Sequence, residues 1–156
     1  MGLPEIFISF ETAAVTAISR SARGALAVVL TDATEGGAAE AVYRSLNEVP
    51  ESAFTAANYR LLKLAFLAAP SKVTVLRVGE DEDAVWDVLN RLPFDWLAAP
   101  SLDNTKVVSY IKAQRANGRG VKAVVADANG PDCEGIVNLG VSGLVLDDGA
   151  IEAAGY

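Results

Sequence analysis

Hydrophobic positions alternate at the start of the chain and form continuous runs later. In residues 5–10, the side chains of Ile6, Ile8 and Phe10 fall on one face and Phe7 on the other, which predicts a strand with an apolar face. Later apolar runs without alternation are typical of strands buried on both faces of a sheet, and they occupy residues 25–30, 72–78, 94–98 and 121–126. Shorter strands are expected at residues 42–46, 136–139 and 144–146.

Three segments between these strands have helical periodicity. Thr55 is expected to cap a helix that runs to about Ala68 and buries Tyr59, Leu62 and Phe66. A second helix begins at the acidic residues 80–83, which favour a helix start, and its core stripe is Val85, Val88, Leu89 and Leu92. A third is capped by Ser101 or Asp103, buries Val107, Val108 and Ile111, and ends at Gly118 and Gly120. The remaining segments, residues 31–41 and 47–52, are interpreted as ordinary surface loops.

The alternation of buried strands with helices predicts an α/β fold, a mostly parallel sheet with helices on both faces. An extended N-terminal arm, residues 1–22, is expected to precede an α/β domain of residues 23–156, with a flexible division near residues 19–24. Residues 11–19 contain no glycine or proline pair that would fold the first strand back as a tight hairpin. We therefore expect this strand to lie outside the core of its own subunit and to pair with another chain.

Composition limits the possible functions of the 156-residue chain, which fits one domain. The net charge of −7 disfavours binding to nucleic acid, because phosphate contacts need clustered lysine and arginine. The absence of histidine removes the commonest general base and zinc ligand. No apolar run reaches the eighteen residues that suggest a membrane span, and Glu5 stands where a secretion signal would be cationic. No cofactor is expected.

An alternative is a small α/β enzyme or nucleotide-binding module, but the sequence contains neither GxGxxG after a strand nor GxxxxGK[ST]. Several local patterns each have a functional and a structural interpretation, and we favour the structural one throughout. Gly118–Arg119–Gly120 is interpreted as a helix end, residues 127–130 and 147–149 as turns, and Cys133 as a small packing residue. The acids Asp81, Glu82, Asp83 and Asp87 are interpreted as a solvated helix start instead of a metal site. Trp96 is expected in the core and Trp86 at its edge.

Three groups of residues resemble a known family: residues 2–6 with 17–21 and 23–24, residues 54–59 with 65–66, and residues 71–78. These short sequence segments and their spacing resemble those of contractile-tail sheath proteins of bacteriophages and phage-like particles, of the type found in Gram-positive bacteria. Such proteins are usually much longer than this chain, so the resemblance implies the N-terminal portion of one.

The resemblance implies a structural protein without catalysis. Subunits of this family form hexameric rings stacked helically around a tail tube and contract to drive the tube through the host envelope. The implied partners are other copies of the chain, the tail tube protein, the baseplate and the tail terminator. The implied location is the virion tail, after assembly in the host cytoplasm. Arms that add strands to neighbouring sheets are implied for residues 6–10, so Ile6, Phe7, Ile8 and Phe10 are the candidate interface residues of the arm.

Charge supplies a second expectation about assembly. Basic residues collect on and after the third helix (Lys106, Lys112, Arg115, Arg119 and Lys122), whereas acidic residues collect at 80–87, 147–148 and 152. Opposite charges on different parts of one subunit suit a head-to-tail contact, although solvated surface charge is an alternative. Assembly of the full-length protein is therefore expected to be salt-sensitive. Reversing Lys112 and Arg115 to glutamate is expected to weaken it and leave the fold intact.

Overall fold

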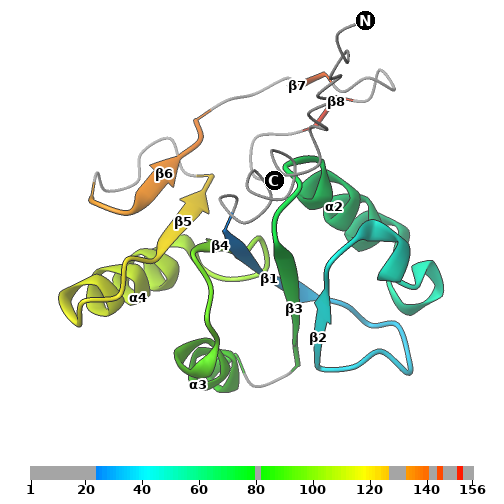
Figure 1. Cartoon of the computed structure of the whole chain (residues 1–156), viewed down its shortest axis with the longest axis horizontal. Helices are drawn as coiled ribbons and strands as arrows, with labels where there is room; N and C mark the ends of the chain where they lie inside the picture. Colours follow the sequence, from blue (N-terminus) through cyan, green and yellow to red (C-terminus); the bar gives the residue numbers. More distant parts are fainter. Residues whose placement is uncertain (1–23, 80–81, 127–132, 141–143, 146–150, 153–156) are drawn as a thin grey trace, which may run out of the picture.

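The computed structural model describes residues 24–79, 82–126, 133–140, 144–145 and 151–152. The labels follow Figure 1. The strands are β1 Ala25–Thr31, β2 Glu40–Tyr43, β3 Lys72–Val78, β4 Trp96–Ala98, β5 Lys122–Val125, β6 Ile136–Asn138, β7 Leu144–Val145 and β8 Ile151–Glu152. The α-helices are α2 Ala56–Leu67, α3 Asp83–Arg91 and α4 Asn104–Ala116, and two 3₁₀ turns cover Leu46–Glu48 and Glu51–Ala53.

The described strands form one mostly parallel sheet and a small hairpin. The sheet order is β2-β3-β1-β4-β5-β6, and β7 pairs with β8 separately. Strand β2 is antiparallel to β3, whereas β1, β3, β4, β5 and β6 run parallel to one another. This confirms the predicted α/β fold. The predicted arm, residues 1–22, lies outside the described residues.

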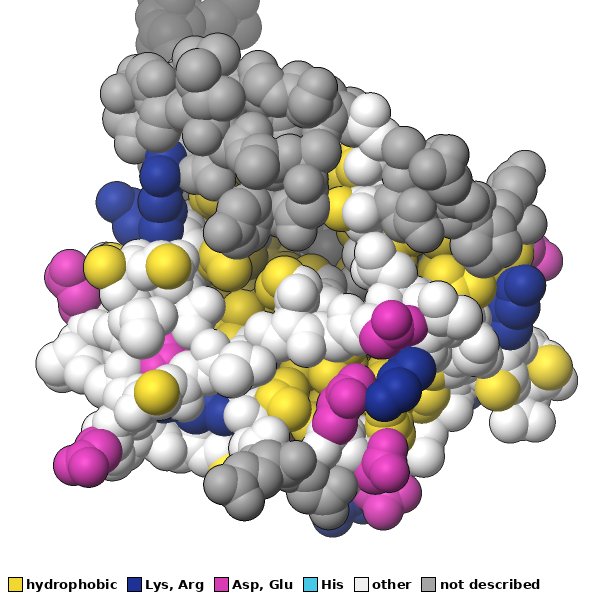
Figure 2. All heavy atoms as spheres, turned by 180° about the vertical axis from the view of Figure 1, so that it is seen from behind, with side chains coloured by type: hydrophobic (Ala, Val, Ile, Leu, Met, Phe, Trp, Pro, Cys, Tyr) yellow, Lys and Arg dark blue, Asp and Glu magenta, His cyan; other side chains and the backbone are white. Residues whose placement is uncertain are grey.

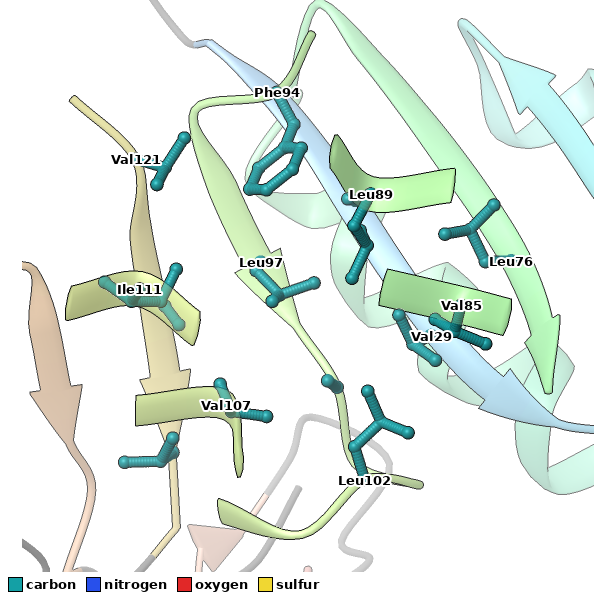
Figure 3. Close-up of a cluster of buried hydrophobic side chains, with 14 of the residues drawn as sticks. Val29, Leu76, Val85, Leu89, Phe94, Leu97, Leu102, Val107, Ile111 and Val121 are labelled. Carbon is teal, nitrogen blue, oxygen red and sulfur yellow. The ribbon is translucent and has the colours of Figure 1, made fainter. Parts of the chain in front are cut away.

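Helices cover both faces of the sheet, as Figure 1 shows, with α2 on one side and α3 and α4 on the other. The side of α3 and α4 buries the larger cluster, which Figure 3 shows around Val29, Leu97 and Ile111. The side of α2 buries Leu62 against alternate residues of the same strands, including Val28 and Val75. Strands β1 and β3 contribute to both clusters, and this explains why their apolar residues do not alternate with polar ones as in a strand buried on one face.

The helix starts follow from capping residues. The hydroxyl of Thr55 accepts a hydrogen bond from the backbone N–H of Asn58 at the start of α2. Of the two candidate caps for α4, Asp103 is the one used, because its carboxylate accepts from the N–H groups of Thr105 and Lys106 at 2.8 and 3.1 Å. These bonds, the one from Lys106 first, lower the pKa of Asp103. At the other end of α4, Gly118 has a φ of +82°, the left-handed conformation expected of a glycine after a helix.

Several boundaries differ from the sequence expectations. Strand β2 begins at Glu40 instead of residue 42, because antiparallel pairing with β3 extends to Glu40 opposite Leu76. The expected loop at residues 47–52 contains parts of two 3₁₀ turns. Trp96 is half-buried instead of fully buried, and the ammonium of Lys122 lies 5.1 Å from its ring centroid. Strand β8 was not predicted from the sequence. Among the described residues, no helix is both long and apolar enough to cross a membrane.

Candidate assembly surfaces

At the carboxyl edge of the sheet, where ligands usually bind in open α/β folds, polar groups of the chain itself occupy the ends of β1 and β3. Asp32 follows β1 directly, and its side chain is inaccessible to solvent. Its Oδ2 accepts hydrogen bonds from Asn58 Nδ2 at 2.7 Å and from the N–H of Thr55 at 3.0 Å, while Oδ1 accepts from the N–H of Thr34 at 2.9 Å. The segment after β1, which the sequence suggested to be an ordinary surface loop, therefore contains a buried carboxylate.

Arg77, near the end of β3, is the counter-ion of this carboxylate. Its Nη1 lies 3.7 Å from Asp32 Oδ1 and donates to the carbonyl of Thr34 at 3.2 Å. Its Nη2 donates to the carbonyl of Ala53, and the guanidinium lies 4.5 Å from the centroid of the Phe54 ring. These contacts join β1, β3, the loop after β1 and the start of α2, and we call them the Asp32–Arg77 clasp. The clasp is a structural connection at the carboxyl ends of β1 and β3.

The electrostatics of Asp32 follow from this geometry. Desolvation alone would raise the pKa of the carboxyl group, but the hydrogen bonds donated by Asn58, Thr34 and Thr55 outweigh it. The pKa of Asp32 therefore lies well below its usual range. The group is ionised at neutral pH and stabilises the fold in that form.

The first described residues, Gly24 and Ala25, lie at the opposite, amino edge of the sheet. The carbonyl of Gly24 accepts from both the N–H and the hydroxyl of Ser71, at 2.9 and 2.7 Å. The N–H of Ala25 donates to Asp95 Oδ2 at 2.6 Å, and the N–H of Asp95 donates back to the carbonyl of Ala25 at 2.8 Å. The first residues of β1 are thus fixed to the residues that precede β3 and β4.

Gly24→Ala is expected to lower the free energy of unfolding by about 2–3 kcal/mol, because two costs add. Gly24 has a φ of +73°, and an added Cβ would lie 2.9 Å from Asp95 Oδ2. Gly36→Ala is the matched control, because Gly36 has a φ of +78° with nothing within 4 Å of an added Cβ, so it measures backbone strain alone. Urea denaturation of the two variants would separate the costs, and equal losses would contradict the predicted crowding at Gly24.

Of the candidate interface residues, the structure describes only the two on α4. Ile6, Phe7, Ile8 and Phe10 lie outside the described residues. Lys112 is exposed on α4. Arg115 is partly buried, pairs with Glu134 and donates to the carbonyl of Val121 at 3.3 Å. Sequence reasoning treated Lys112 and Arg115 as equivalent surface charges, but Arg115 connects α4 to the residues before β5 and β6. Because of these contacts, we expect reversal of Arg115 to lower the stability of the fold as well.

Acidic and basic side chains are interspersed on the face that Figure 2 shows. Lys106 does not belong to a separate basic region, because its Nζ donates to Glu82 Oε2 at 2.9 Å. This bond raises the pKa of Lys106. Both side chains are partly exposed, so we expect the pair to contribute little to stability. The division of charge is therefore less complete than the sequence suggested.

The other candidate sites have the following positions. Arg119 of Gly118–Arg119–Gly120 lies over the ring of Phe94, and Cys133 packs against the larger core cluster. Trp86 lies at the edge of that cluster against Tyr110, with ring centroids 5.0 Å apart. Residues 127–130 and 147–149, and Asp81 of the acidic group, lie outside the described residues. Among the residues described, no group of three or more acidic, cysteine or histidine side chains could hold a metal ion.

Comparison with known proteins gives one informative result. No model of a known protein family matches the chain. The chain is similar to a phage tail sheath protein. It is 32% identical to the tail sheath protein of Clostridium phage phiCD119 over 173 aligned positions, which include 99% of this chain. The chain spans 46% of the length of that curated relative. This similarity supports the tail sheath resemblance found in the sequence.

Proposed function

We propose that the chain forms the N-terminal part of a contractile-tail sheath subunit. In this proposal, copies assemble into stacked hexameric rings around a tail tube and contract to drive it through the host envelope. The observation that carries the proposal is the 32% identity to a tail sheath protein over 99% of the chain. The tail tube protein, baseplate and tail terminator are the proposed partners, and the virion tail, assembled in the host cytoplasm, is the proposed location.

The arrangement of the carboxyl edge favours this proposal over the enzyme alternative. A doubly wound enzyme would place its ligand beyond the ends of the parallel strands. Here the ends of β1 and β3 are joined by Asp32 and Arg77, whose side chains are at most 9% exposed. A structural ion pair at these two strand ends suits a structural subunit.

The division into an arm, residues 1–22, and an α/β domain, residues 23–156, is part of the proposal. Gly24 and Ala25 are held by Ser71 and Asp95, so a load applied to an arm would be transferred to β3 and β4. We propose that the alternating segment of residues 6–10 adds as a strand to a neighbouring copy.

Negative-stain electron microscopy would test this function. The samples are the chain itself and the full-length sheath subunit of which we propose it forms a part. Rings or ribbed tubes are expected, and antibodies raised against the folded chain should label tails along their length. The proposal would be contradicted if both samples stayed monomeric at every protein and salt concentration and the antibodies did not label tails.

Charge reversal on α4 is expected to give different results at two positions. Lys112→Glu should change the free energy of unfolding by less than about 0.5 kcal/mol, because the side chain is exposed. Arg115→Glu should lower it by about 1–2 kcal/mol, because it removes the bond to Val121 and places a like charge beside Glu134. Urea denaturation measures both. Because Arg115→Glu also affects folding, only Lys112→Glu is suitable for testing assembly. We expect assembly of Lys112→Glu to be weaker and less dependent on salt than that of the parent.

A further inference from the structure

An apolar groove lies beside α3, at the carboxyl end of β3. Its lining includes the buried side chains of Leu76 and Val85, the half-buried Val88 and the exposed Ala84. The groove has a volume of about 390 Å³, which is in the range of small binding sites. We call it the α3 groove.

The side of the α3 groove formed by β2, the edge strand of the described sheet, carries a carboxylate. Glu40 lines the groove opposite Leu76 in the β2–β3 ladder. Val42 follows on the same face of β2 and is 51% exposed. Arg77 also lines the groove, but its guanidinium is the counter-ion of Asp32. The ion pairs found among the described residues do not use Glu40, so the groove combines apolar surface with an available negative charge.

A second apolar surface lies at the other end of β3. Leu67, the last residue of α2, is 79% exposed, more than any other large hydrophobic side chain in the described part of the chain. Together with Leu46, Phe66 and Pro70 it lines a hollow of about 530 Å³. We call this surface the Leu67 patch. Burial of an exposed leucine against a partner is favourable, so the patch is suited to a protein contact.

The charged residues that line the Leu67 patch are both cationic, Arg44 and Lys63. Both are exposed, and the ion pairs found among the described residues use neither. Glu48 approaches this surface, but its Oε2 accepts from the backbone N–H of Arg44 at 2.8 Å. The patch therefore combines apolar surface with positive charge and is complementary to the α3 groove.

Strand β3 holds the two surfaces apart within one subunit. Pro70 and Ser71, directly before β3, line the patch, whereas Gly79, directly after β3, lines the groove. The seven residues of β3 separate its ends by about 20 Å. Figure 1 shows β3 between the end of α2 and the start of α3, helices that cover different faces of the sheet. One subunit cannot bring its own patch into its own groove, whereas two copies can.

We propose that the Leu67 patch of one subunit binds the α3 groove of a second copy, with Leu67 packed against Ala84 and Val88 and with Arg44 and Lys63 beside the carboxylate of Glu40. The inference rests on the proposed self-assembly and names the surfaces that meet. Because the two surfaces differ, the contact is heterologous. Such contacts form closed rings or helical arrays, the arrangements proposed for this subunit.

Leu67→Ser tests the apolar part of the contact. The side chain is 79% exposed, so the urea midpoint should be unchanged. Self-association in sedimentation velocity, measured on the chain and on the full-length sheath subunit, should weaken at least about tenfold because a leucine is no longer buried. Leu139→Ser is the matched control, since Leu139 is also exposed and lines neither surface. The control should associate as the parent does.

Cross-linking tests which surfaces meet. Leu67→Cys and Ala84→Cys are made in separate chains, each with Cys133→Ser, because Cys133 is a free thiol. When the two chains are mixed and oxidised with copper phenanthroline, they should form a disulfide-linked dimer that neither chain forms alone. A mixture of Leu67→Cys with Leu139→Cys, in the same background, is the control and should not form one.

The possible results separate this inference from the proposed function. If the parent assembles and Leu67→Ser, folded by circular dichroism, associates equally well, the inference is wrong while the sheath function stands. Equal weakening by Leu139→Ser overturns it in the same way. A linked dimer of Leu67→Cys alone would mean that the patch meets its own copy, and the absence of a linked dimer in the mixture would also overturn the contact. A parent that does not self-associate as the chain or at full length would overturn both.

Discussion

Asp32→Asn is expected to lower the free energy of unfolding at pH 7 by about 3–5 kcal/mol, the usual cost of breaking a buried ion pair. The substitution preserves the size of the side chain but leaves Arg77, only 9% exposed, without its counter-ion. It also replaces a carboxylate oxygen by an amide nitrogen that cannot accept the bonds of Thr55 and Asn58 or that of Thr34. Urea denaturation at pH 7 measures the loss.

A double variant is the control for this prediction. Arg77→Met removes the buried cation and retains an unbranched apolar side chain against Phe54. Asp32→Asn with Arg77→Met should be more stable than the sum of the single losses predicts, because removing both charges leaves neither one buried alone. Strict additivity would mean that the 3.7 Å pair contributes no coupling energy.

The same residue sets a pH dependence. The pKa of Asp32 is lowered in the folded state, so its contribution to stability is present above the ordinary aspartate pKa of about 4 and is lost as the pH falls through the folded value. The stability difference between the parent and Asp32→Asn should therefore shrink below about pH 4. Parallel stability curves from pH 7 to pH 2 would contradict it.

Local sequence patterns predicted those elements whose structure depends mainly on residues adjacent in the chain. Residues 72–78 are the predicted strand and also the observed β3, because four of its seven side chains are apolar and it lies in the sheet interior. Thr55 was correctly identified as a cap for the same reason, since a cap depends on its own next three residues. Strand β8 has two residues and depends on β7 for its definition, so no local signal indicates it.

Contacts between distant residues were the part that the sequence did not predict. Asp32 and Arg77 are 45 positions apart, and local pattern gave no reason to pair them. One signal was present: Arg77 is a charged residue between Leu76 and Val78 in an apolar strand, and such a charge needs a partner. The hollow at the amino edge of the sheet that Lys72, Arg91 and Arg119 line was also missed, because these residues come from distant parts of the chain that the fold brings together.

Removal of residues 1–19 is expected to abolish tube formation and to change the free energy of unfolding by less than about 0.5 kcal/mol. Among the described residues, the start of β1 is held by Gly24, whose carbonyl accepts from Ser71, and by Ala25, whose N–H donates to Asp95. A chain that begins at Arg20 retains all of these bonds. The segment of residues 6–10, by contrast, has an apolar face and backbone groups that strand addition to a neighbour would satisfy.

A variant of unchanged length separates the side chains from the arm itself. Ile6→Ser, Ile8→Ser and Phe10→Ser together remove the apolar face, whereas Ser9→Ala is the matched control between them. Electron microscopy should show tubes for the control and none for the triple variant, while the urea midpoints of both match that of the parent. A large loss of stability on deletion of residues 1–19 would instead make the segment an integral strand of its own subunit's sheet, and the proposed exchange between copies would then be wrong.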